Sequence, residues 1–173
     1  MHRRDQREFD AFVRTVGDRL LHLAELLTGD PGRAERRVRR ALARTYLKWR
    51  HSEEPDPTRI MHRALLGGYL DPWRPLPWRP CRGSSPWRDG ADAGEAEARD
   101  EVLRGLDRLT RLERAVVVLR AYGLLDEFDT AQALGVPETA VRRALHRAAA
   151  KVRAGAVNTV TWRADAGVRA EGL

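Results

Sequence analysis

Polar and basic side chains recur at intervals of three and four residues between positions 138 and 151, which places them along one face of a helix. The outward residues are Glu138, Thr139, Arg142, Arg143, His146, Arg147 and Lys151. An arginine guanidinium donates two parallel hydrogen bonds to a phosphate or to the edge of a guanine, so this face suits nucleic acid. The DNA contacts that we expect come from Thr139, Arg142, Arg143, His146 and Arg147. Taken alone, the motif also fits a helical hairpin whose basic face contacts only water.

Other kinds of chemistry find little support in the sequence. The chain has neither a phosphate-binding glycine loop nor a dinucleotide-binding motif. The histidines, none of which has the spacing of paired metal ligands, are His2, His22, His51, His62 and His146. Cys81 is the only cysteine, so an intrachain disulfide and a thiolate metal cluster are both excluded. We therefore expect a protein that is not an enzyme and that uses no cofactor and no metal.

The residues before the basic face are those that a helix-turn-helix requires. Ala131 is small at a point where two helices must approach closely. Gly135 can adopt the positive φ of the turn, and Val136 and Val141 fill the angle between the two helices. The basic face is therefore predicted to lie on the second helix of this motif.

Two further helices are predicted upstream of the turn. From about Glu95, one face carries Val102, Leu103, Leu106 and Leu109. Thr110 and Glu113 then have the spacing of a capping box, in which each side chain accepts a hydrogen bond from the other residue's backbone amide. On the helix after the turn, the inward positions that we expect are Val141, Leu145, Ala148 and Val152. Beyond about Gly155 no period is visible, and weak structure is expected.

The first part of the chain has the pattern of three helices. The first has an apolar face at Phe9, Phe12, Val13, Val16, Leu20, Leu23 and Leu27. Asp30 and Pro31 are a typical helix start, and a second buried stripe follows at Ala34, Val38, Ala41, Leu42, Thr45, Tyr46 and Trp49. A third helix is predicted from about Thr58 to Leu70, where Pro72 ends it.

Residues 72–94 differ in composition from both flanks, because Pro-Trp-Arg recurs there among Gly, Ser and Pro. Such a composition is typical of an extended linker. The sequence therefore predicts an all-α fold of two small helical domains, 1–71 and 95–153, joined by a linker over 72–94 and followed by a tail over 154–173.

The net positive charge of the chain indicates nucleic acid as a partner, as the basic face does. The chain carries 32 Lys and Arg against 25 Asp and Glu, a formal net charge of +7, and nearly all of the cations are arginine. This excess favours association with nucleic acid. The N-terminus is charged, and no apolar stretch approaches the length of a membrane span, so we expect a cytoplasmic protein without a signal peptide.

The second domain resembles the promoter-binding C-terminal domain of extracytoplasmic-function sigma factors of RNA polymerase. The resemblance lies in LDRLTRLERAVVVLRAYGLLDEFDTAQALGVPETAVRRALHRAAAKV. The first domain is similar to that family's first domain, in a version most familiar from actinobacteria. This similarity lies in FDAFVRTVGDRLLHLAELLTGDPGRAERRVRRALARTYLKW.

The resemblance implies a sigma factor that directs promoter-specific transcription initiation. Its first domain would bind core RNA polymerase and open the upstream edge of the bubble, where Trp73 and Arg74 would stack on bases. Its second domain would bind the more distal promoter element, and an anti-sigma protein would be a further partner.

The second helix departs from the family pattern. The family usually has acidic residues and a Gln-Glu pair facing the polymerase, whereas this chain has Arg36, Arg39 and Arg40, a possible partner-binding face. The alternative function is therefore a degenerate sigma-like protein, acting as a DNA-binding regulator or protein-interaction module without standard core polymerase binding. This face would then bind an acidic partner.

Overall fold

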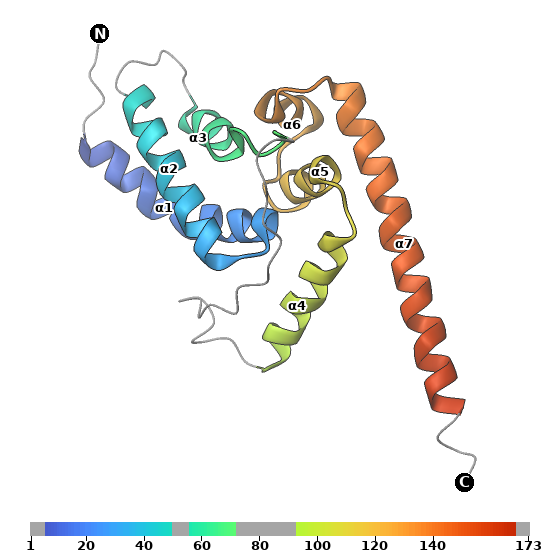
Figure 1. Cartoon of the computed structure of the whole chain (residues 1–173). Helices are drawn as coiled ribbons and strands as arrows, with labels where there is room; N and C mark the ends of the chain where they lie inside the picture. Colours follow the sequence, from blue (N-terminus) through green and yellow to red (C-terminus); the bar gives the residue numbers. More distant parts are fainter. Residues whose placement is uncertain (1–5, 50–55, 72–92, 169–173) are drawn as a thin grey trace.

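A computed structural model describes residues 6–49, 56–71 and 93–168, and these ranges contain seven α-helices and no strand (Figure 1). The first unit consists of α1 (Gln6–Thr28), α2 (Pro31–Trp49) and α3 (Pro57–Leu66). The second consists of α4 (Ala93–Asp107), α5 (Arg111–Ala121), α6 (Glu127–Leu134) and α7 (Glu138–Val168). The all-α prediction is confirmed. None of these helices combines the length and the apolar composition that crossing a lipid bilayer requires.

Local side-chain chemistry sets the starts of two helices where the sequence predicted them. The Asp30 Oδ1 atom accepts a hydrogen bond of 2.7 Å from the Arg33 backbone amide, and Pro31 is the first residue of α2. At α5, the Thr110 amide donates to the Glu113 carboxylate at 2.9 Å and the Glu113 amide donates to the Thr110 hydroxyl at 3.3 Å. The predicted capping box is therefore present.

The end of α3 was predicted too late. The helix ends at Leu66 because Gly67 leaves the helical conformation and Gly68 takes a φ of +68°, so glycine and not Pro72 terminates it. Arg37 of α2 then donates to the Leu65 carbonyl at 2.7 Å, which satisfies one of the carbonyls that the helix end leaves without an internal partner.

One hydrophobic core extends through both units. It joins Leu23 and Leu27 of α1 and Leu65 of α3 to Leu106 of α4 and Leu119 of α5. In Figure 1, α5 lies between the α1–α2 pair and α7. The last turns of α1, residues 23–28, are therefore buried throughout, and the one-face pattern of this helix missed the burial of Ala24, Glu25 and Leu26. A helical segment that is buried all round must be covered on more than one side, and here both units cover it.

Buried polar groups also join the two units. Arg114 of α5 is 5% exposed, and its Nε donates to the Leu26 carbonyl of α1 at 2.7 Å. The same guanidinium forms an ion pair of 3.1 Å with Asp107, at the end of α4. Nearby, Arg99 of α4 pairs with the buried Glu25 of α1 at 3.2 Å. Because each buried charge has an opposite charge or a carbonyl beside it, this interface tolerates ions in a largely apolar setting.

Several predicted inward positions are wrong. Val102, Leu145 and Val152 are 52%, 37% and 51% exposed. Val141 and Ala148 are buried as predicted, and Ala144, which was not predicted to be inward, is fully buried. The stripe of α7 that contacts α5 is narrow and is made of small residues.

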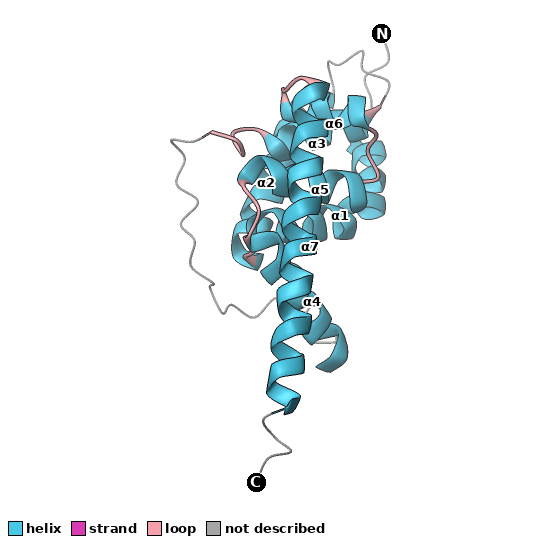
Figure 2. Cartoon of the chain, turned by 90° about the vertical axis from the view of Figure 1, so that its right-hand side faces the viewer, coloured by secondary structure: helices cyan, strands magenta, loops and turns pink. Residues whose placement is uncertain are grey.

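Beyond this contact, α7 extends away from the body of the molecule to Val168, so the expected weak structure after Gly155 is also wrong (Figure 2). Most of the predicted linker, residues 72–92, lies outside the described residues.

Because Leu119 belongs to the core that both units share, Leu119→Ala should lower the free energy of unfolding by about 2–5 kcal/mol. Denaturant titration of the purified chain measures this loss. Leu47→Ala is a matched control at a helical position that is 70% exposed, and it should cost no more than about 0.5 kcal/mol. Equal losses in the two variants would contradict a core that extends through α5.

Candidate nucleic-acid interface

Helices α6 and α7 form the predicted helix-turn-helix. Gly135 closes α6 in the left-handed conformation, with φ 67° and ψ 36°, as the sequence predicted. Its amide and that of Val136 both donate to the Ala131 carbonyl, the latter at 3.1 Å. Asp126 caps the other end of α6, where its side chain accepts from the Asp129 amide at 2.7 Å. The turn is therefore held from both ends of the short helix.

A small apolar core holds α6 across α7. It consists of Val116 of α5, Ala131 of α6, and Val141 and Ala144 of α7, all buried, with Val136 packed against them. The predicted roles of Ala131, Val136 and Val141 agree with this packing. Because this core fills the inner side of α7, the opposite side of that helix must face outward.

Thr139, Arg143 and His146 lie opposite the buried stripe of α7, and all three side chains are exposed. Their spacing of three and four residues aligns them along the helix axis. Arg143 forms no ion pair with any other described residue, so its guanidinium is available to an external ligand. We call these three residues the outer face of α7.

Arg142 lies on one flank of the outer face. Its Nε forms an ion pair of 2.6 Å with Glu127, at the start of α6, and the two side chains are 61% and 34% exposed. Water screens a pair of this exposure strongly, so the pair constrains Arg142 only weakly.

Arg147 and Lys151 lie on the opposite flank, and both contact Glu113 of α5. Arg147 Nε is 3.1 Å from Glu113 Oε1, and Lys151 Nζ is 2.6 Å from Glu113 Oε2. The sequence identified Glu113 only as a helix cap and missed this second role. No local signal marks it, because the partners are 34 and 38 residues away along the chain.

The Glu113 carboxylate remains ionised in strongly acidic solution. Burial by itself would raise its pKa, since the side chain is only 1% exposed. Hydrogen bonds from Lys151, from the Thr110 amide and from Arg147 outweigh that effect and lower the pKa from 4.5 to about 2. The carboxylate therefore stays charged between its two cations at any physiological pH.

A second basic surface lies on α2, on the other side of the molecule from α7 (Figure 1). Arg36, Arg39 and Arg40 are all exposed there, and we call them the arginine surface of α2. Arg39 pairs with Glu35, one turn earlier on the same helix. Arg36 and Arg40 form no ion pair with the other described residues. The structure therefore separates the two sets of arginines that the sequence singled out.

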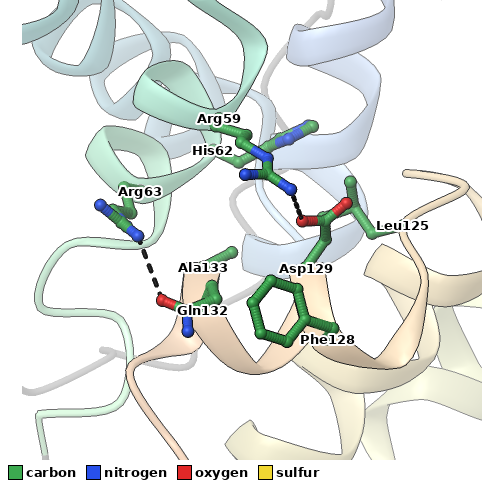
Figure 3. A pocket seen from close by; sticks show the side chains of 8 residues that line it. All are labelled: Arg59, His62, Arg63, Leu125, Phe128, Asp129, Gln132 and Ala133. Carbon is green, nitrogen blue, oxygen red and sulfur yellow. Dashed lines mark hydrogen bonds and ion pairs between the residues drawn. The ribbon is translucent and has the colours of Figure 1, made fainter. Parts of the chain in front are cut away.

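A cleft between the units is lined by residues of α3 and by residues of α6 and the turn before it (Figure 3). Arg59 of α3 forms an ion pair of 2.6 Å with Asp129 of α6, and Arg63 donates to the Gln132 side chain at 3.2 Å. His62 also lines this cleft, and burial lowers its pKa. These contacts hold α6 beside α3 and involve none of the residues that the sequence assigned to DNA.

Two other predicted contact residues, Trp73 and Arg74, lie outside the described residues. Among the side chains that the structure describes, no three His, Cys, Asp or Glu gather as metal ligands would.

Comparison with known proteins covers most of the chain. Residues 99–152 match the family described as Sigma-70, region 4. The chain is 34% identical over 149 residues to the RNA polymerase sigma-E factor of Streptomyces coelicolor, a match that spans 84% of each protein. The sigma-E factor of Streptomyces avermitilis is 31% identical over 84% of this chain and 83% of the relative.

A solved structure, that of CnrH in complex with the cytosolic domain of CnrY, has a similar fold. The TM-score is 0.61 at 22% identity, and the match covers 87% of this chain and 88% of the other. At this identity the likeness shows the fold alone.

The lowered pKa of Glu113 predicts how stability depends on pH. Because this pKa is lower in the folded than in the unfolded chain, the ionised carboxylate stabilises the fold fully above about pH 4.5, and this contribution is lost as the pH falls toward about 2. Glu113→Gln removes the titrating group. The difference in unfolding free energy between the unaltered chain and this variant should therefore shrink from about pH 6 to about pH 3, as measured by urea titration. A difference that stays constant over this interval would contradict the assignment.

Proposed function

This chain belongs to the extracytoplasmic-function sigma factors of RNA polymerase and directs promoter-specific transcription initiation, and we propose how its described residues divide that work. The relatives match over 84% of the chain, a length that includes both helical units. The degenerate sigma-like alternative is not favoured, because the similarity is not confined to the DNA-binding part.

We propose that α7 enters a major groove of promoter DNA with its outer face. The observation that supports this proposal is the alignment of Thr139, Arg143 and His146 opposite the buried stripe of the same helix. A helix in the major groove must bury one side against its own domain and present polar side chains on the other. Arg143 is the residue that we expect to contact a base edge, because its guanidinium pairs with no carboxylate of the described residues.

Arg142 and Arg147 take a different role in this proposal. They flank the outer face, and each already lies beside a glutamate, so we assign them to phosphates on the two sides of the groove. Phosphate contacts position a protein on the duplex, whereas base contacts select the sequence.

The partners of the first unit follow from the family. We propose that the first unit binds core RNA polymerase and that the arginine surface of α2 is part of a protein contact. In the family this helix usually presents acidic side chains to the polymerase, and close like charges across an interface cost several kcal/mol. The arginine surface therefore suits an acidic partner, either a polymerase surface that has changed to match or an anti-sigma protein. The similarly folded CnrH, solved with a second protein, supports a protein partner of the latter kind.

We further propose that the chain acts in the cytoplasm, where it would find polymerase and chromosome, and acts by binding alone, without catalytic chemistry of its own. The stacking of Trp73 and Arg74 on bases of the opened promoter remains a prediction.

Arg143→Ala should weaken binding to a promoter duplex by about 1–3 kcal/mol and relax specificity at one base pair, because it removes a base contact. Arg142→Ala should instead weaken binding to all sequences and reduce the salt dependence. Fluorescence anisotropy at several salt concentrations separates these effects, and Arg14→Ala, at an exposed position of α1, is the control. If the triple change of Arg142, Arg143 and Arg147 to Ala leaves the affinity unaltered, α7 does not contact DNA.

The arginine surface of α2 predicts weak binding to a core polymerase whose facing surface is basic and has not changed to match it, because like charges would face each other. Changing Arg36, Arg39 and Arg40 to Asp, Gln and Glu should restore binding, which co-elution on a sizing column measures. Tight binding of the unaltered chain, abolished by the same triple change, would show that the arginine surface is a matched polymerase contact and that the expected repulsion is wrong.

A further inference from the structure

We propose that Glu113 is a positioning residue for DNA binding, which acts by holding Arg147 and Lys151 of α7 in the orientation that meets the DNA backbone. The inference rests on the proposed function of α7. It concerns a residue that lies on α5, outside the helix-turn-helix itself, and that does not touch DNA.

Glu113 is itself held firmly. Its carboxylate accepts the Thr110 amide at 2.9 Å within the capping box, and its side chain is 1% exposed. A buried side chain with both oxygens in use has one available orientation, so it can serve as a fixed point for other groups.

Two like charges converge on this fixed point. Arg147 and Lys151 are one helical turn apart, a spacing at which two cations repel. Each oxygen of the carboxylate pairs with one cation, since Oε1 faces Arg147 and Oε2 faces Lys151. One negative charge thus lets both cations lie on one flank of α7. Glu113, Arg147 and Lys151 together carry a net charge of one positive unit.

The geometry of Arg147 leaves its DNA-binding atoms available. The bond to Glu113 uses Nε, whereas the two terminal nitrogens make no hydrogen bond to the other described residues, and the side chain is 53% exposed. A guanidinium fixed at Nε presents its terminal edge in a set direction, and that edge is suited to a phosphate. Holding a flexible side chain before binding reduces the entropy lost on binding.

Glu127 provides an internal comparison on the opposite flank. It neutralises Arg142 with the same charge, but both side chains of that pair are partly exposed. Removal of either glutamate adds one positive unit to the DNA-binding side, which by electrostatics alone strengthens binding. If Glu113 positions Arg147, its removal should instead weaken DNA binding, because the lost orientation of Arg147 outweighs the added charge.

Glu113→Gln is the informative variant, since glutamine also completes a capping box. Its binding to a fluorescent duplex, selected from random sequence by the unaltered chain, should be weaker by about three- to tenfold. Glu127→Gln should bind equally well or more tightly. In the Arg147→Ala background, Glu113→Gln should cause no further loss, a coupling that a general structural defect would not produce. Circular dichroism and thermal unfolding establish that each variant is folded.

Tighter binding by Glu113→Gln, matching Glu127→Gln, would overturn the inference, as would an equal loss with and without Arg147. If Glu113→Gln does not fold, Arg147→Lys decides the matter: lysine keeps the charge without the planar edge, so weakened binding supports positioning and unchanged binding overturns it. A loss of binding in Arg143→Ala with no effect in Arg147→Ala would overturn the inference while leaving the proposed function of α7 intact.

Discussion

Helix α5 carries two adjacent buried charges that face opposite ways, and the arrangement of the whole molecule depends on them. Glu113 turns toward α7, where it pairs with Arg147 and Lys151. Arg114 turns toward the first unit, where it binds the Leu26 carbonyl. A buried charge is stable only beside an opposite charge or a hydrogen-bonding group, so each residue requires its own neighbour to be in place. Through this pair α5 joins α7 to the first unit.

This arrangement keeps the two basic surfaces apart. The outer face of α7 and the arginine surface of α2 lie on different sides of α5, so DNA and a protein partner can occupy them without competing (Figure 1). The ion pair between Arg59 and Asp129 also connects the units, and its exposure makes it weaker than the buried contact of Arg114.

Features that depend on neighbours in the chain were predictable from the sequence. The capping box at Thr110, the cap at Asp30 and the left-handed Gly135 each follow from local chemistry, and so does the outward direction of Arg143. Features that depend on distant contacts were not. The helical period indicated that Leu145 was buried, whereas Ala144 is buried in its place, in the core that α7 shares with α5. The second role of Glu113 likewise arises from residues that only the fold brings near it.

If the proposed division between the two basic surfaces holds, the outer face of α7 contacts DNA while the arginine surface of α2 contacts protein. Site-directed photocrosslinking tests it most directly, with Cys81 replaced by Ser and a crosslinker attached at His146→Cys on α7 or at Ala43→Cys beside the arginine surface. In a complex of the chain with polymerase and a promoter duplex, we predict crosslinks from position 146 to DNA within one major groove and from position 43 to protein. Crosslinks to DNA from position 43 with none from position 146 would contradict this division between the two surfaces.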